Sequence, residues 1–377
     1  MTNAASPPTL ANPLDAWRRF RNRLVSSPKF QSFAQKTPGA RTLARKDGEK
    51  LFDLIAGFTY TQTLYALTET GLIGAMKDGA QPLDALAFAA DLPTDRAEVL
   101  LKGGEALGLV ERWRGGYGLT RLGAAFAGAP GLTDLVLHHR ELYLDLADPK
   151  DVLVGEGETR LAAYWPYVFG ADAAQDNATA QTYSELMTRS QAMVAEDTLA
   201  AQSLFDVRHL MDVGGGVGTF LIAAGQRWPD LRLTLFDLPA VAEAAQGRFG
   251  AAGLAGRAAV RLGSFREALP DTGADAISLI RVLYDHEDDT VRALLTRAYE
   301  ALPPGGRLIV SEPMGGGDAP HRYGDVYFAL YCLAMRTGRV RSVDQISTMM
   351  EDAGFTRIRA PRTRRAFVTS VVTGLKV

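Results

Sequence analysis

Residues 208–220, RHLMDVGGGVGTF, and residues 233–239, LTLFDLP, decide how this chain folds. An apolar run precedes four glycines and a helix-like run follows them. This pattern predicts a strand, a tight turn and the start of a helix. The glycines let the backbone approach a ligand closely, because a Cβ at these positions would collide with it. The second run ends at Asp237, about twenty residues further on, where a carboxylate at a strand tip can accept two ribose hydroxyls. The two stretches together predict a nucleoside-binding site.

The composition narrows the class of protein. With 377 residues, of which 47% are hydrophobic and 22% charged, the chain is expected to be globular and to form two domains. A net charge of -2 creates no field that would recruit nucleic acid. Cys332 is the only cysteine, and the five histidines lack ligand spacing, so neither a disulfide nor a metal is expected. Without a long apolar run or a signal-peptide core, the protein is expected to be cytoplasmic.

Residues 1–45 are expected to form a flexible arm that is basic and aromatic. Ten lysines and arginines lie between residues 15 and 50 against three acidic residues, and four apolar side chains interleave with them: Phe20, Leu24, Phe30 and Phe33. One interpretation is a helical arm that packs on a partner subunit. The other is a segment that touches an anionic membrane surface, to which basic and aromatic residues together are suited.

Residues 46–131 resemble a winged helix, because three helical segments precede a hairpin with its turn at Gly115-Gly116. DNA binding is not expected, since the helix at residues 95–104 carries only Arg96 and Lys102 as cations. Residues 132–200 predict a helical, aromatic-rich connector that walls a substrate pocket. The side chains expected to contact the substrate are Tyr183, Met187, Met314 and Tyr327.

Residues 201–377 alternate apolar strands with amphipathic helices, which predicts an α/β fold with a parallel, doubly wound, Rossmann-like sheet. Strands are expected at residues 209–213, 231–236, 258–262, 276–282, 306–312, 355–359 and 367–373. Helices are expected at residues 220–227, 240–249, 289–301 and 343–353. Ligands bind at the carboxyl ends of such strands.

Four stretches together resemble the class I S-adenosylmethionine (SAM)-dependent O-methyltransferases of the acetylserotonin/caffeate type. They are DVGGGVG at 212–218, FDLP at 236–239, ALPPGGRLIVSEP at 301–313 and DAGF at 352–355. The resemblance covers about residues 45–375. It implies SAM as methyl donor, S-adenosylhomocysteine as product, no metal, and a homodimer formed through the winged-helix domain.

The resemblance also implies the cofactor contacts. The glycines suit the methionine part of SAM, Asp237 the ribose diol and Phe265 an apolar slot for adenine. Ser264 stands where the family has an aspartate that holds the adenine amine, and a hydroxyl can accept that hydrogen bond less strongly. The residues expected to contact SAM are Asp212, Gly214, Gly215, Gly216, Asp237, Leu238, Ser264, Phe265 and Arg281.

The catalytic turn departs from the family pattern Leu-His-Asp-Trp, whose histidine is the general base. The chain has LYDH at 283–286, with Tyr284 at the base position, Asp285 retained and His286 at the tryptophan position. Glu312 matches the family's orienting glutamate, whereas a second glutamate is replaced by Val340. His286 could be the base, oriented by Asp285 or Glu312, or Tyr284 could be. Catalysis could also rest on placement of the hydroxyl alone, with both rings only shaping the pocket beside adenine.

Within the family, the basic aromatic arm and the Tyr-Asp-His turn look most like bacterial carotenoid hydroxyl methyltransferases. Those enzymes act on hydroxyneurosporene or demethylspheroidene, whose tertiary alcohols are far less acidic than a phenol with its pKa of about 10. An apolar hydroxylated substrate of this kind would also give the arm a reason to lie at the inner membrane. The alternatives are methylation of a phenolic polyketide or flavonoid, methylation of a tetrapyrrole ring, and a ligand-sensing DNA-binding regulator.

Overall fold

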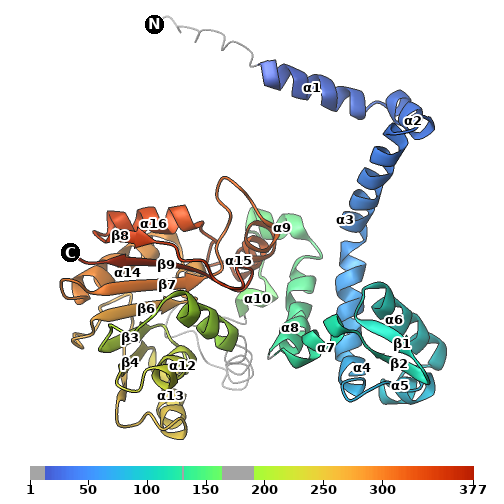
Figure 1. The fold of residues 1–377 in the computed structure, drawn as a ribbon. Coiled ribbons are helices and arrows are strands. Elements are labelled where there is room, and N and C mark those ends of the chain that lie inside the picture. The colour runs from blue at the N-terminus through green and yellow to red at the C-terminus, as the bar shows by residue number, and fades with distance from the viewer. Residues whose placement is uncertain (1–12, 130, 164–190) are drawn as a thin grey trace, which may run out of the picture. The chain divides into compact units, whose positions relative to one another are not determined.

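The computed structural model describes residues 13–129, 131–163 and 191–377 (Figure 1). The chain divides into two compact units, residues 1–120 and 121–377. This division differs from the boundaries expected at residues 45, 131 and 200. The boundary expected at residue 45 falls inside a continuous helix, α3 (Ala40–Glu69). The second boundary differs because the second compact unit begins at Arg121.

The first unit begins with helices and ends in a hairpin. Its helices are α1 (Pro13–Val25), α2 (Pro28–Lys36), α3, α4 (Leu72–Ala75), α5 (Leu83–Ala89) and α6 (Thr94–Ala106). The hairpin pairs β1 (Val110–Trp113) with β2 (Gly116–Leu119) in antiparallel register. The core forms where α3, α6 and the hairpin meet, and a Cβ at Gly104 would lie 2.9 Å from both Leu67 and Val110. The expected helices and glycine-turn hairpin are therefore present.

The second unit opens with helices α7 (Arg121–Gly128), α8 (Leu132–Asp145), α9 (Pro149–Val154) and α10 (Arg160–Ala163). A seven-stranded sheet follows, in the order β5-β4-β3-β6-β7-β9-β8. Its strands are β3 (His209–Val213), β4 (Arg232–Asp237), β5 (Ala258–Leu262), β6 (Ala276–Ile280), β7 (Arg307–Glu312), β8 (Thr356–Arg359) and β9 (Ser370–Leu375). The expected alternation of strands and helices is confirmed.

The sheet is mixed: the expected parallel, doubly wound arrangement is present in β3 to β7, and the C-terminal strands depart from it. The strands β3 to β7 are parallel to one another, but β9 runs antiparallel to both β7 and β8. No helix separates β8 from β9 in the chain. A parallel pair needs a crossover connection, usually a helix, whereas strands joined directly return antiparallel.

Helices cover both faces of the sheet (Figure 1). On one face, α14 (Asp288–Ala301) and α16 (Val343–Asp352) share a hydrophobic core with Met211 and Val213 of β3. On the other face, α12 (Thr219–Arg227) and α13 (Pro239–Ala251) pack near Leu210 of the same strand. Successive residues of β3 thus alternate between the two cores, as the strand period of two requires. This arrangement leaves the carboxyl ends of the parallel strands free to form a site.

Three shorter elements lie beyond those strand ends. A 3₁₀ turn, η3 (Leu283–Asp285), follows β6. A π-helical segment, η4 (Arg322–Phe328), follows β7 and continues into α15 (Ala329–Met335). Such π-helical segments are rare and are frequent at functional sites.

Candidate active site

The glycine turn after β3 packs tightly against protein atoms at Gly215 and has free space beside Gly216. Gly214, Gly216 and Gly218 have φ of 69°, 61° and 78°, in the left-handed region that favours glycine. A Cβ at Gly215 would lie 2.2 Å from Asp212 Oδ2, so a side chain has no room there. A Cβ at Gly216 would meet no atom within 4 Å. The turn can therefore receive a ligand against its backbone near Gly216.

Asp237, at the end of β4, lies beside this turn. Its Oδ2 accepts a hydrogen bond from the Gly216 N–H at 2.7 Å, and its Oδ1 accepts one from the Leu238 N–H at 2.7 Å. Burial raises the pKa of Asp237 to about 6, against the opposing effect of these two N–H groups. A carboxylate offers about four acceptor positions, so two remain for a ligand. The predicted proximity of the glycine turn and Asp237 is confirmed.

The side chain of Asp212 is buried in the protein, whereas it was expected to contact SAM. Its Oδ1 accepts a hydrogen bond from Ser278 Oγ at 2.6 Å, and its side chain is fully buried between β3 and β6. Burial raises its pKa to about 7. Because its Oδ2 lies where a Cβ of Gly215 would be, the carboxyl is on the protein side of the turn. The expectation that Asp212 contacts the cofactor is thus corrected. Its carboxyl supports the glycine turn from the protein side.

Phe265 and His286 form an aromatic corner. Their rings meet edge to face with centroids 5.2 Å apart. His286 Nδ1 lies 3.3 Å from a guanidinium nitrogen of Arg266, and Ser264 Oγ accepts the Arg266 N–H at 3.2 Å. Burial, with Arg266 and Arg341 adding to it, lowers the pKa of His286 to about 4, so its ring is neutral at physiological pH. This corner suits an apolar, planar group such as a purine base.

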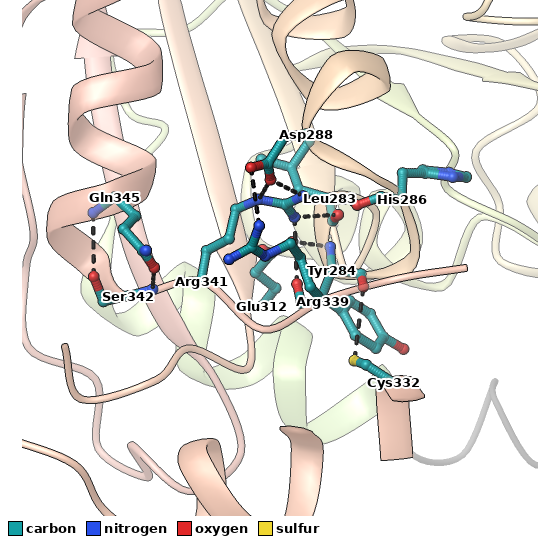
Figure 2. A network of polar contacts seen from close by, with 10 residues as sticks. All are labelled: Leu283, Tyr284, His286, Asp288, Glu312, Cys332, Arg339, Arg341, Ser342 and Gln345. Carbon is teal, nitrogen blue, oxygen red and sulfur yellow. Dashed lines mark hydrogen bonds and ion pairs between the residues drawn. The ribbon is translucent and has the colours of Figure 1, made fainter. Parts of the chain in front are cut away.

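Glu312, at the end of β7, holds the backbone of the η3 turn. Its Oε2 accepts the Tyr284 N–H at 3.2 Å, and the residue is fully buried. Burial raises the pKa of Glu312 to about 7, which Arg341 opposes, and burial raises that of Asp285 to about 8. The imidazole of His286 points away from Glu312 and Arg341 (Figure 2). The expected orientation of His286 by Glu312 is therefore not formed.

Arg281 and Tyr284 stack at the end of β6. Arg281 has φ of 57°, an uncommon and strained conformation for a residue with a Cβ. Its guanidinium carbon lies 5.6 Å from the centroid of the Tyr284 ring, and one of its nitrogens lies 3.4 Å from Tyr284 Oη. The strained backbone thus aims a cation at the residue that occupies the family's base position.

Arg341 is a positioning residue that the sequence analysis missed. Its side chain is 1% exposed and donates to Leu283 O at 2.9 Å, to His286 O at 2.8 Å and to Asp288 Oδ1 at 2.7 Å (Figure 2). It therefore ties the backbone on both sides of the η3 turn to the start of α14. No local pattern could have found it, because these partners are 53 to 58 residues away along the chain.

Of the four side chains expected to contact the substrate, two belong to the described residues. Tyr183 and Met187 lie outside the described residues. Met314 is 1% exposed and packs in the core with Val282 and Ile346, so its observed role is packing. Tyr327, on η4, places its Oη 2.7 Å from Nε2 of His139, a residue of α8.

Two further features of the described residues bear on function. None of their helices is long and apolar enough to cross a membrane. No group of three or more histidine, cysteine, aspartate or glutamate side chains among them is arranged to hold a metal ion.

Residues 143–356 match the family model of the O-methyltransferase domain. The chain belongs to this family. It is 51% identical over 355 residues to demethylspheroidene O-methyltransferase of Cereibacter sphaeroides, covering 94% of each chain. It is 45% identical to demethylspheroidene O-methyltransferase of Rhodobacter capsulatus, over 94% of this chain and 88% of that one. Its fold is similar to human N-acetylserotonin methyltransferase in complex with SAM, with a TM-score of 0.73, 22% identity and coverage of 88% and 97%.

This O-methyltransferase is a SAM-dependent enzyme, and the expected family, fold, reaction and cofactor are confirmed. Its residues also fit SAM. The open backbone at Gly216 can receive the methionine part, the remaining acceptor positions of Asp237 suit a ribose diol, and Phe265 with His286 suits adenine. SAM supplies a methyl group on a positively charged sulfur, and the chain's own residues position that group and the acceptor.

Proposed function

We propose that this O-methyltransferase methylates the tertiary hydroxyl of an acyclic carotenoid, of the demethylspheroidene or hydroxyneurosporene type. The observation that carries the proposal is the identity of 51% and 45%, over 94% of the chain, to two enzymes named for demethylspheroidene. Similarity that extends over almost the whole chain includes the connector expected to wall the substrate pocket as well as the proposed SAM site. The remaining alternatives for the acceptor are a phenol of a polyketide or flavonoid and a tetrapyrrole ring.

The geometry of the catalytic turn is compatible with an alcohol acceptor. His286 contacts Phe265 and Arg266, and Glu312 is engaged with the backbone of Tyr284. We therefore propose that Tyr284, Asp285 and His286 shape the site and that none of them acts as the general base. In this proposal the ring of His286 packs beside adenine. Ser264, Leu238 and Arg281 remain proposed SAM contacts.

The test is the identity of the methylated product. The purified protein is incubated with SAM labelled in its methyl group and, separately, with a hydroxylated acyclic carotenoid, a phenolic polyketide and a chlorin. We expect label in the carotenoid ether and none above background in the other two. Mixtures that lack the protein give the background. Transfer to the phenol or the chlorin without transfer to the carotenoid would refute the proposal.

We further propose that the enzyme is a homodimer held through α3. Five apolar side chains between residues 51 and 58 of this helix are 60–71% exposed: Leu51, Phe52, Leu54, Ile55 and Phe58. An exposed apolar cluster of this size on a water-facing helix is unfavourable unless another surface covers it. A second copy of the chain is the partner that the family resemblance implies.

The remaining proposal concerns α1, which we expect to lie against an anionic membrane surface such as the inner membrane. Trp17, Phe20 and Leu24 follow helical spacing along one face and are 39–58% exposed. Four arginines accompany them within the same helix: Arg18, Arg19, Arg21 and Arg23. Apolar residues on one face with flanking cations suit a helix that lies in the headgroup region. A lipid-soluble substrate would be presented at that surface.

A further inference from the structure

Two histidine–tyrosine pairs connect α8 with η4 and α15 inside the second unit. His139 Nε2 lies 2.7 Å from Tyr327 Oη, and His138 Nε2 lies 2.9 Å from Tyr331 Oη. The rings of Tyr327 and Tyr331 have their centroids 6.0 Å apart. The chain thus contains two chemically identical pairs side by side, built from adjacent residues of one helix and tyrosines one helical turn apart.

The two pairs differ in how far they are enclosed. His138 is 8% exposed and Tyr331 is 6% exposed, so this pair is closed off. His139 and Tyr327 both keep part of their surface accessible. Even so, burial raises the pKa of Tyr327 and lowers that of His139 to about 4. The second pair is therefore neutral at physiological pH and, unlike the first, keeps part of its surface exposed.

Both tyrosines stand on a segment that packs against the catalytic turn, because η4 continues into α15 and α15 contacts η3. Cys332, one residue after Tyr331, has its Sγ 3.7 Å from Tyr284 O. Tyr327 lies beside Tyr331 on the same segment, with ring centroids 6.0 Å apart. The partly exposed Tyr327 thus stands on the segment that packs against the turn where the resemblance places the family's base.

We propose that Tyr327 binds the substrate hydroxyl and passes its proton to His139, so that this pair replaces the missing family histidine; the proposal rests on the acceptor being an alcohol. The substrate O–H bond breaks and its proton joins Tyr327 Oη, while the proton of Tyr327 joins His139 Nε2. The hydroxyl oxygen bonds the methyl carbon, and the electron pair of the former carbon–sulfur bond stays on sulfur. The imidazolium then releases its proton to solvent.

A weak base is sufficient for this transfer. An alcohol is barely acidic, but its O–H becomes strongly acidic as the oxygen forms its third bond to the methyl carbon. Neutral imidazole accepts that proton even when its own pKa is low, provided that it is positioned within hydrogen-bond reach. The hydrogen bond of 2.7 Å between Tyr327 Oη and His139 Nε2 meets this requirement.

The experiment compares matched variants of the two pairs. Tyr327→Phe removes the accessible hydroxyl, and Tyr331→Phe removes the enclosed one. His139→Gln keeps a hydrogen-bond partner for Tyr327 but cannot take up a proton. For each variant we measure kcat, the substrate Kd in the presence of S-adenosylhomocysteine from the shift in polyene absorbance, and Tm.

We expect Tyr327→Phe to lower kcat by about 50-fold or more, within the range of general acid–base effects, and to weaken substrate binding severalfold. His139→Gln should lower kcat to a similar extent while leaving the substrate Kd within about twofold, because the tyrosine hydroxyl remains to bind. Tyr331→Phe should lower Tm but change kcat by no more than about threefold, because its hydroxyl is enclosed.

The proposal is overturned if Tyr327→Phe and Tyr331→Phe lower kcat equally, or if His139→Gln keeps the wild-type kcat. The carotenoid assignment is tested separately, by identifying the acceptor that the wild-type enzyme methylates. If that acceptor is another alcohol, the ratio of variant to wild-type kcat on it gives the same test. If the enzyme methylates only phenols, the proposal fails with its premise.

Discussion

Asp237 combines two tasks in one side chain. Its two oxygens hold the Gly216 and Leu238 N–H groups at 2.7 Å, which keeps the glycine turn against the end of β4. The same carboxylate retains acceptor positions for a ribose diol. Loss of the side chain would therefore remove a direct contact and loosen the turn that receives the rest of the ligand.

We predict that Asp237→Ala weakens SAM binding at least about tenfold, which corresponds to about 1.4 kcal/mol. Isothermal titration calorimetry on the purified protein measures the effect. Asp230→Ala is the matched control, because Asp230 is an exposed carboxylate on the loop that precedes β4. An affinity unchanged from wild type in Asp237→Ala would rule out the assignment of the ribose site.

Residue type and spacing predicted the place of Asp237 at the strand end beside the glycine turn, but not the orientation of Asp212 or Met314. Asp212 occupies the next-to-last position of β3, and strand periodicity does not say whether a carboxyl there reaches over or under the glycine turn. The close approach of Gly215 decides this, because Asp212 Oδ2 fills the space where a Cβ would be. Met314 follows a strand tip, but the packing of α16 encloses it in the core.

At the scale of elements, the η3 turn is held from outside by a segment that follows α15. Arg341 donates to the carbonyls of Leu283 and His286, and Gly338 lets the chain pass so close that its Cβ would lie 2.0 Å from Tyr284 O. Glu312 supports the turn from the sheet. The position of the turn thus depends on elements on both sides of it.

Arg341→Met is predicted to destabilise the fold by about 2–5 kcal/mol, because the carbonyls of Leu283 and His286 each lose a buried hydrogen bond from the guanidinium and Asp288 loses one of its partners. Urea denaturation followed by circular dichroism gives the free energy of unfolding. Arg339→Ala is the control, since Arg339 contacts the same Asp288 through an exposed ion pair and should cost at most about 1 kcal/mol. Equal effects of the two substitutions would show that Arg341 does not hold the turn.

The boundaries of β3 and β5 agree with the prediction residue for residue, and the other elements differ by a few residues. These elements could be predicted because apolar periodicity and glycine turns are local signals. The direction of β9 depends instead on how the C-terminal strands connect and join the edge of the sheet. The π-helical segment η4 likewise has no periodic signature of its own.

At the scale of the whole molecule, the exposed apolar cluster on α3 predicts self-association. Ile55→Asp should convert the protein to monomers, because a charge in a dimer interface is left without water or a partner. Sedimentation velocity measures the outcome. Val99→Asp is the control, since Val99 on α6 is 67% exposed, close to the 71% of Ile55. A wild-type protein that is monomeric at micromolar concentration would contradict this prediction.

The α1 helix gives a separate expectation at this scale. The protein should float with vesicles that contain anionic lipid and not with neutral vesicles, because its four arginines add attraction to the burial of Trp17 and Phe20. The double substitution of Trp17 and Phe20 by serine should reduce the floated fraction at least about threefold. Trp113→Ser, which removes a half-exposed tryptophan from β1, serves as the control. Equal flotation of both variants would exclude α1 as the contact.

The sequence by itself determined the α/β class, the order of strands and helices along the chain, the SAM cofactor and the family, because these depend on residues close together in the chain. Only the tertiary structure decided which side chains meet beyond the strand ends. It joins Tyr327 to His139 across 188 residues and Arg341 to Leu283 across 58. It also turns the ring of His286 toward Phe265 and away from Glu312. Such contacts depend on how helices pack beyond the strand ends, and no local pattern of residues encodes that packing.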